Sequence, residues 1–275
     1  MPEFVIIGAL GLIRIVTLSG ERVALHRLGQ RESGWLATMI IGFCGAAAVL
    51  WVMNLWQGTS SWHPATLWIG AIYAIAFSLY TASMARGPIS IVSPWSNATV
   101  IILWLLHPSG GILAVASLAL FALGAFLLTG HKVSAPVLWM LASDGFLALA
   151  RIADVHHVTE PPVIYATNLF TAISLWMMIP LLVSGKIRSV ARLVRAEPGW
   201  SFIAASSNAA AYLALFCLLR FLHPAIVEAI SAVASSVAAF SGVFFFHEGG
   251  LLRKTFSSIF MTMGTVMLLI ATYGS

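Results

Sequence analysis

The sequence predicts an all-α integral membrane protein in which about ten transmembrane helices form two inverted five-helix repeats. Three observations lead to this fold class. Hydrophobic residues make up 60% of the 275 residues and charged residues only 8%, too few to solvate the surface of a soluble protein of this size. Apolar runs of roughly 20 residues, the length that crosses the hydrocarbon core once, follow one another along the chain. The second half of the chain repeats the order of features of the first half.

Charged residues and proline- or glycine-rich breaks divide the chain into spans. The expected spans are 3–22, 35–56, 65–86, 88–107, 111–130, 135–154, 162–184, 199–220, 223–246 and 252–273. Arg14, Glu21 and Arg22 interrupt the first span, and polar residues 206–208 lie in the middle of the eighth. Because so little chain remains between the spans, we do not expect a separate soluble domain. No basic residue precedes the first apolar run, so we also expect no cleavable signal peptide.

Basic residues predict the orientation of the helices. The loops that follow odd-numbered spans hold Arg22, Arg27, Arg31, Arg86, Lys132, Lys186, Arg188, Arg192, Arg195, Arg253 and Lys254. The opposite side has only Arg151 and Arg220, both near span ends. The positive-inside rule therefore places the first set of loops in the cytoplasm and both termini outside. Since the positive charge is spread over these loops, the net charge of +5 does not suggest a nucleic-acid partner.

The sequence lacks the motifs of disulfide frameworks, metal sites and nucleotide-binding sites. Cys44 and Cys217 both fall within spans, where we interpret them as small apolar side chains rather than as a disulfide. The histidines lack metal-ligand spacing, and no glycine-rich phosphate loop occurs. We therefore expect no cofactor, no metal site and no ATP hydrolysis.

Two halves, residues 1–132 and 133–275, share an order of features. The stretches ASMARGP (82–88) and CLLRFLHP (217–224) each end a span with a basic residue followed by proline. Each half closes with a helix that carries an internal glycine, Gly124 or Gly264. Five-span halves insert with opposite orientation, and transporters built this way bind their substrate near the midplane between the repeats. Chance similarity between apolar helices is the alternative explanation.

Two stretches carry a family resemblance. The first, LYTASMARGPISIVSPWSNATVIILWLL (79–106), resembles the third-to-fourth helix segment of EamA-type proteins of the drug/metabolite transporter superfamily. Residues 219–271 resemble the last two helices, with Glu248 and Gly264 at positions where the family often has glutamate and glycine. The resemblance implies a multi-pass transporter of the cell (inner) membrane that moves amino acids, amines or similar metabolites, and not an enzyme. The family usually keeps both termini in the cytoplasm, whereas the charges of this chain predict the opposite.

Ionisable residues deep within the spans are the first candidates for function, because each is costly in lipid. Arg14 lies in the middle of the first span and Asp144 in the middle of the sixth, its counterpart in the expected repeat. We expect both side chains to face the protein interior, close to each other or to a common solute. They would bind a zwitterion or couple a proton, or else lock the halves together as a salt bridge. Arg151 is expected to snorkel from the end of its span.

Glu228 begins a face of small and hydroxylated residues on the ninth span, which continues through Ser231 and Ser235. Such a face can serve close helix packing. A carboxyl group on it can also exchange a proton near neutral pH when it is partly desolvated. We therefore predict Glu228 and Asp144 as proton-coupling residues.

Pro94 interrupts the fourth span and frees a backbone carbonyl that only protein or water can satisfy. The polar residues around this kink, and those of the third and eighth spans, complete the expected cavity, although a packing kink is the structural alternative. The predicted cavity residues are Arg14, Tyr80, Ser93, Trp95, Asn97, Asp144, Asn208, Tyr212 and Ser231.

The expected function is therefore secondary transport of a small organic metabolite by alternating access around a cavity between spans one, three, four, six, eight and nine. The expected partners are this small-molecule substrate, membrane lipids and coupled protons. An intramembrane enzyme that acts on a lipid or lipid-linked substrate is the alternative, but it would need acids or histidines clustered at one interface. A non-transporting subunit of a larger complex would need a partner chain to satisfy its midplane charges.

Overall fold

The fold consists of helices packed side by side, as the sequence predicts. The computed structural model describes residues 2–31, 34–58, 62–106, 111–129, 133–157, 161–222 and 224–273. Within these ranges, ten helices are long and apolar enough to cross a membrane, and no strand occurs. The expected class, an all-α protein with ten membrane spans, is confirmed.

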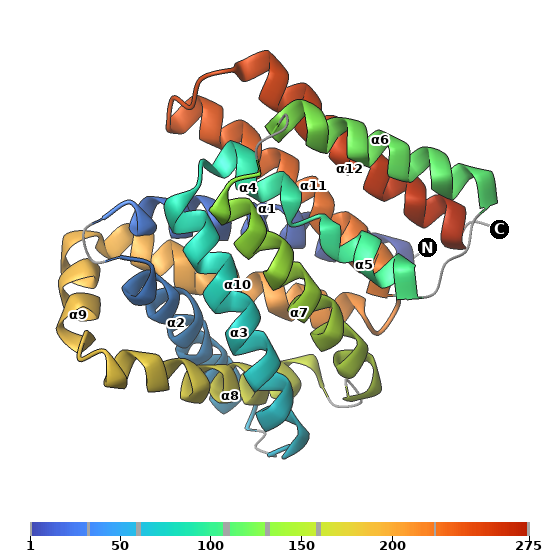
Figure 1. Ribbon diagram of the computed structural model, residues 1–275. Coiled ribbons are helices and arrows are strands. Elements are labelled where there is room, and N and C mark those ends of the chain that lie inside the picture. The colour runs from blue at the N-terminus through green and yellow to red at the C-terminus, as the bar shows by residue number, and fades with distance from the viewer. Residues whose placement is uncertain are drawn as a thin grey trace.

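Twelve helices make up the described part of the chain (Figure 1). In order, they are α1 (Pro2–Gly29), α2 (Gly34–Gln57), α3 (Ala65–Arg86), α4 (Ile89–Trp95), α5 (Ala98–Leu106), α6 (Gly111–Thr129), α7 (Ala135–His157), α8 (Pro162–Val183), α9 (Ile187–Ala196), α10 (Pro198–Leu218), α11 (Pro224–Phe245) and α12 (Leu251–Tyr273). The short helices α4 and α5 together form the fourth span, and α9 is too short to cross a membrane.

The fourth span is broken next to its internal proline. Helix α4 contains Pro94 and ends at Trp95, and α5 begins at Ala98. The two intervening residues form a tighter turn, in which the Ser96 N–H donates to the Ser93 carbonyl at 3.1 Å and the Asn97 N–H to the Pro94 carbonyl at 3.2 Å. The break therefore presents polar backbone and side chains in the middle of a span.

Helices of one half of the chain pack mainly against helices of the other half, and these contacts form corresponding pairs. Helix α1 packs on α10 as α7 packs on α3, and α2 packs on α10 as α8 packs on α3. Helix α2 also packs on α8, and α6 packs along α12 at one edge of the molecule (Figure 1). Related halves would produce this pattern, in which α1, α2, α3 and α6 correspond to α7, α8, α10 and α12. The repeat itself and its boundary after residue 132 remain predictions, and residues 130–132 lie outside the described ranges.

Two expectations from the sequence are wrong in detail. Helix α1 continues past residue 22 to Gly29, so Arg22 is a buried helix residue and not a loop residue. Arg151 is also buried, so neither arginine belongs in the count of charges that flank the membrane. Lys254 is buried as well, but the remaining basic residues keep the same bias, and the orientation stays a prediction. In addition, the segment after the seventh span contains helix α9, which the sequence analysis does not predict.

The contact between α6 and α12 depends on glycine at the closest approach. A Cβ atom on Gly124 would lie 2.7 Å from the Ser257 carbonyl oxygen and 2.8 Å from the Met261 Cγ. A Cβ atom on Gly264 would lie 2.7 Å from both the Phe121 nitrogen and the Ser117 oxygen. Each glycine thus lets the backbone of the opposite helix approach, as small residues do in membrane helix pairs.

We expect Gly124→Ala and Gly264→Ala each to lower the thermal unfolding temperature of the detergent-solubilised protein. The added methyl group overlaps backbone atoms of the partner helix, and overpacking of this kind costs about 1–3 kcal/mol. Gly145→Ala in α7 is the matched control, because its Cβ would meet nothing within 4 Å. Alanine is the better helix former, so the control should be neutral or slightly stabilising. Equal effects at all three positions would contradict this account of the α6–α12 contact.

Candidate functional site

Six of the spans enclose a small cavity with a strongly polar wall. Its volume is about 40 Å³, which leaves space for only a few water molecules, since one needs roughly 10–15 Å³. The wall is contributed by α1, α3, the α4–α5 break, α5, α7, α10 and α11. The lining residues are Arg14, Leu18, Glu21, Arg22, Phe77, Tyr80, Ser96, Asn97, Thr99, Val100, Leu147, Arg151, Tyr212, Glu228, Ser231 and Ala232.

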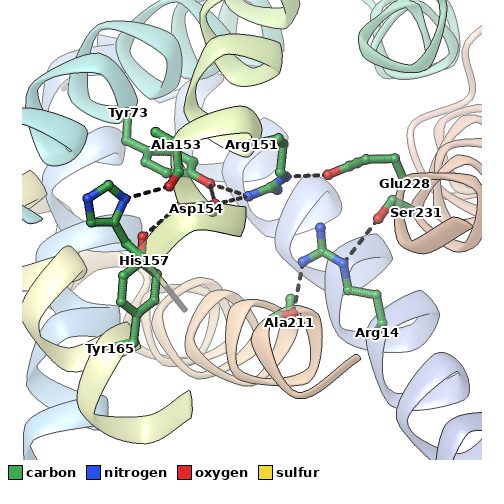
Figure 2. A network of polar contacts seen from close by, with 10 residues as sticks. All are labelled: Arg14, Tyr73, Arg151, Ala153, Asp154, His157, Tyr165, Ala211, Glu228 and Ser231. Atoms are coloured by element: carbon green, nitrogen blue, oxygen red, sulfur yellow. Dashed lines mark hydrogen bonds and ion pairs between the residues drawn. The ribbon is translucent and has the colours of Figure 1, made fainter. Parts of the chain in front are cut away.

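Arg14 connects α1 to α10 and α11 on one side of the cavity. Its Nε donates to the Ser231 hydroxyl at 3.1 Å, and its Nη1 donates to the Ala211 carbonyl at 2.9 Å (Figure 2). The guanidinium carbon lies 5.1 Å from the centre of the Tyr212 ring, within range of a cation–π contact. The side chain is only 2% exposed. Arg14 therefore reaches the protein interior, as expected, and is held there by neutral groups.

Arg151 occupies the centre of a second and denser network (Figure 2). Its Nε donates to the Glu228 carboxylate, and its Nη1 donates to Asp154 Oδ2 at 3.2 Å and to the Tyr73 hydroxyl. The hydroxyls of Tyr73 and Tyr165 both donate to Asp154, the latter at 2.7 Å. Arg151 is 3% exposed, so the expectation that it snorkels to the interface is wrong. The carboxylates of α7 and α11 compensate its charge inside the protein.

Arg22 links α1 to the break in the fourth span. Its Nη1 donates to the hydroxyls of Ser93 at 3.0 Å and Ser235 at 2.6 Å, and the Ser235 hydroxyl donates to Asn97 Oδ1 at 2.6 Å. These contacts join α1, α4 and α11 beside the cavity. Ser93 therefore supports a wall residue and does not line the cavity itself.

Some polar atoms of the cavity wall have no hydrogen-bond partner among the residues that the structure describes. They are Glu21 Oε2, Arg22 Nε and the Tyr80 hydroxyl. Tyr80 lies close enough to Arg22 to interact electrostatically, but the pair does not meet hydrogen-bond geometry. Buried polar groups are normally satisfied by protein or by ordered water, and leaving them unpaired is costly. These atoms are therefore the positions at which water or a solute would gain most by binding.

The structure separates Arg14 from Asp144. Asp144 Oδ1 accepts a hydrogen bond from the Thr99 hydroxyl at 2.8 Å, and within the described ranges its Oδ2 has no partner. Arg14 and Asp144 form no ion pair with each other, and Asp144 is not part of the cavity wall. Thr99, the partner of Asp144, does line the cavity. The expected direct pair is thus absent, because each residue finds a nearer neutral partner.

Two other predicted residues lie away from the cavity. Trp95 precedes the break in the fourth span and faces a groove between α5 and α6, where it contacts Phe121. Asn208 donates from Nδ2 to the Gly42 carbonyl at 3.1 Å and so fastens α10 to α2. Both residues have structural contacts that their position in a span does not reveal. The predicted residues that do line the cavity are Arg14, Tyr80, Asn97, Tyr212, Glu228 and Ser231.

Several residues of the site are not among those predicted from the sequence, although helical spacing indicates some of them. Arg14, Leu18, Glu21 and Arg22 follow one another at intervals of four, three and one, which places them on one face of α1. All four line the cavity. Asp154 follows Arg151 by three residues, the spacing of an ion pair along a helix. Reading Glu21 and Arg22 as the end of a span hides the first pattern.

A metal centre has no ligand set in the described ranges, since no group of three or more histidine, cysteine, aspartate or glutamate side chains comes together there. The buried acids instead contact arginine, tyrosine and threonine. The groups that line the cavity can contact a solute through charge and hydrogen bonds.

Comparison with other proteins identifies the fold but not a family. No family model and no curated protein matches the sequence. A solved structure titled "Crystal structure of protein" superposes on this chain with a TM-score of 0.65 over 95% of this chain and 98% of the other, at 13% sequence identity. The arrangement of helices over nearly the whole chain is therefore one that occurs in a solved structure.

We expect Arg151→Gln to destabilise the protein more than Glu228→Gln. Loss of one partner from a buried ion pair costs about 3–5 kcal/mol. Glu228→Gln leaves Arg151 paired with Asp154, whereas Arg151→Gln leaves two buried carboxylates without their cation. Thermal unfolding in detergent measures both effects. The control is Arg86→Gln, which removes an exposed charge near Trp139. If Arg151→Gln is no more harmful than this control, the network does not carry the stability assigned to it.

Proposed function

We propose that this chain is a secondary transporter of the cell (inner) membrane that moves a small organic metabolite, such as an amino acid or an amine, by alternating access. The observation that supports this most directly is the buried cavity with charges of both signs. Arg14, Arg22 and Arg151 line it together with Glu21 and Glu228. A solute that carries both an anionic and a cationic group would find complementary partners there. The unpaired atoms of Glu21 and Tyr80 add positions for polar contacts.

The small volume of the cavity supports a mechanism in which the surrounding helices move. Pockets for small molecules usually enclose about 300–1,000 Å³, whereas this cavity encloses about 40 Å³. A metabolite would therefore fit only after the surrounding helices separate. In our proposal the two halves rock against each other, as inverted repeats do in other secondary transporters. The matched exchange of helix partners between residues 1–132 and 133–275 supports the repeat on which this mechanism is based.

One end of the molecule is closed by a contact between the proposed halves. The Glu248 carboxylate accepts hydrogen bonds from the backbone N–H groups of Ile89 at 2.8 Å and Ser90 at 3.0 Å. Lys254 and His26 lie 3.6 and 3.7 Å from the same carboxylate. A carboxylate that caps the first turn of α4 interacts favourably with the helix dipole. We propose that this contact must break when the cavity opens toward this end, which the basic residues assign to the cytoplasm.

Proton coupling is part of the proposal. A proton on Glu228 would cancel the charge that faces Arg151 Nε, and this side of the guanidinium would then be available to a solute while Nη1 stays paired with Asp154. Asp144, whose Oδ2 lacks a partner in the described part of the chain, is the second candidate. The alternative of an intramembrane enzyme has less support, because the buried acids Glu228 and Asp154 are both bound to Arg151.

We expect Tyr80→Phe to weaken substrate binding without lowering stability. The change removes a hydroxyl that lines the cavity but forms no hydrogen bond with described residues. Tyr165→Phe is the matched control, because its hydroxyl donates to Asp154 and does not line the cavity. It should lower the unfolding temperature, because a hydrogen bond to a charged group contributes about 1.5–3 kcal/mol to stability. The measurement is thermal unfolding with and without pools of amino acids and amines, since a ligand stabilises the state that it binds. Stabilisation of Tyr80→Phe equal to that of the parent would argue against this cavity as the binding site.

Transport into proteoliposomes tests the coupling residue. We expect uptake by the parent to respond to an imposed pH gradient and uptake by Glu228→Gln, normalised to folded protein, to have lost this response. Asp144→Asn is measured in parallel, because it also removes a buried carboxylate. If only Asp144→Asn loses the response, coupling belongs to Asp144. If both variants respond as the parent does, neither residue couples protons.

A further inference from the structure

Helix α9 lies across the ends of two spans rather than parallel to them (Figure 1). Gly185, with φ of 65°, occupies the left-handed region just after α8 and lets the chain turn there. Pro198 begins α10 at a position where its missing N–H costs nothing. Helix α9 is thus held between the end of one membrane-length apolar helix and the start of another, a position that would lie at the membrane surface.

The ten residues of α9 form three separate stripes. Ser189 and Leu193 are buried, and α9 packs on α2 and α10. Arg188, Arg192 and Arg195, spaced by four and three residues, form an exposed basic stripe. Ile187 and Val194, 52% and 40% exposed, belong to a third stripe that is apolar. A helix with a packed face, a cationic face and an exposed apolar face matches an interface between protein, headgroups and acyl chains.

The positive charge of α9 is not neutralised by the protein within the described ranges. The nearest acid in the sequence, Glu197, forms ion pairs with Arg31 and, at 3.8 Å, with Arg27 of α1. Neither Arg188, Arg192 nor Arg195 forms an ion pair with a described residue. Lys186, also exposed, adds a fourth positive charge at the start of the helix.

We propose that α9 is a binding site for anionic phospholipids, in which the arginine stripe holds the phosphate headgroups and the apolar stripe contacts the upper part of the acyl chains. Arginine is suited to this task because its planar guanidinium donates two parallel hydrogen bonds to a phosphate. Clusters of basic residues next to membrane spans attract anionic lipids, each charge contributing on its own. An acidic protein segment would satisfy the arginine stripe but not the apolar stripe beside it. The inference does not depend on the proposed transport function.

Native mass spectrometry of the full-length protein in a nonionic detergent tests this proposal, with phosphatidylglycerol and phosphatidylcholine as probes. We expect the parent to prefer phosphatidylglycerol. The triple variant Arg188→Gln, Arg192→Gln, Arg195→Gln should bind it more weakly, by about fivefold for each arginine removed. The control triple Arg86→Gln, Arg220→Gln, Arg253→Gln removes the same charge from exposed positions elsewhere and should bind as the parent does. Unfolding temperatures show that all three proteins are folded.

A second variant separates a lipid from a free anion. Ile187→Ser with Val194→Ser keeps every charge of α9 and should also weaken phosphatidylglycerol binding. Equal loss of phosphatidylglycerol in the two arginine triples would overturn the proposal, because binding would then follow net charge alone. Displacement of the lipid by an equal concentration of inorganic phosphate would overturn it as well, as would a parent protein that binds both lipids equally. After any of these three outcomes, an acidic partner or a free anion would be the better occupant of α9.

Discussion

The need to compensate buried arginines organises the centre of this molecule. A guanidinium removed from water is stable only if it is paired with charge or fully hydrogen-bonded. The structure meets this need in three different ways and to different degrees, since Arg22 Nε has no partner in the described ranges. Arg151 is paired with two carboxylates, Arg14 is held by a hydroxyl, a carbonyl and an aromatic ring, and Arg22 is held by two serine hydroxyls. Since these partners come from helices far apart in sequence, compensation of charge also fixes how α1, α4, α7, α10 and α11 meet.

The buried polar groups are not all satisfied to the same extent. This difference distinguishes contacts that hold the helices together from groups that remain available to a solute. The Arg151 network is nearly saturated, because two tyrosines and an arginine satisfy Asp154. Around Glu21 and Tyr80, by contrast, polar atoms line the cavity without a partner in the described chain. A saturated network holds helices in one arrangement, whereas a wall with unpaired polar atoms is stabilised when water or a polar solute binds to it. The cavity thus has one rigid side on α7 and one receptive side on α1 and α3.

The sequence predicts the fold class because the cost of exposing polar backbone and charge in lipid leaves a simple pattern. The same cost selects Arg14, Glu228 and Ser231 as interior residues, and they line the cavity. Hydropathy does not indicate which interior residues contact each other. The sequence therefore suggests that Arg14 and Asp144 lie close to each other or to a common solute, and it does not reveal the ion pair between Arg151 and Asp154. It also places the end of the first span at its charges, where the helix continues for two more turns. Partner choice depends on side-chain reach and on helix rotation, which hydropathy does not encode.

At the end of the molecule that carries most of the basic residues, acidic side chains join helices to one another. Its acids are used to join segments: Glu197 holds the end of α1 beside the start of α10, and Glu248 holds the α11–α12 connection on the first turn of α4. Because these acids are committed to such contacts, they do not neutralise the arginines of α9. Within the described ranges, Arg188, Arg192 and Arg195 therefore keep their positive charge uncompensated on one short helix, where we propose that anionic headgroups bind. A helix bound to the membrane surface there would also anchor α8 and α10, and the rest of the bundle would have to move relative to that anchor.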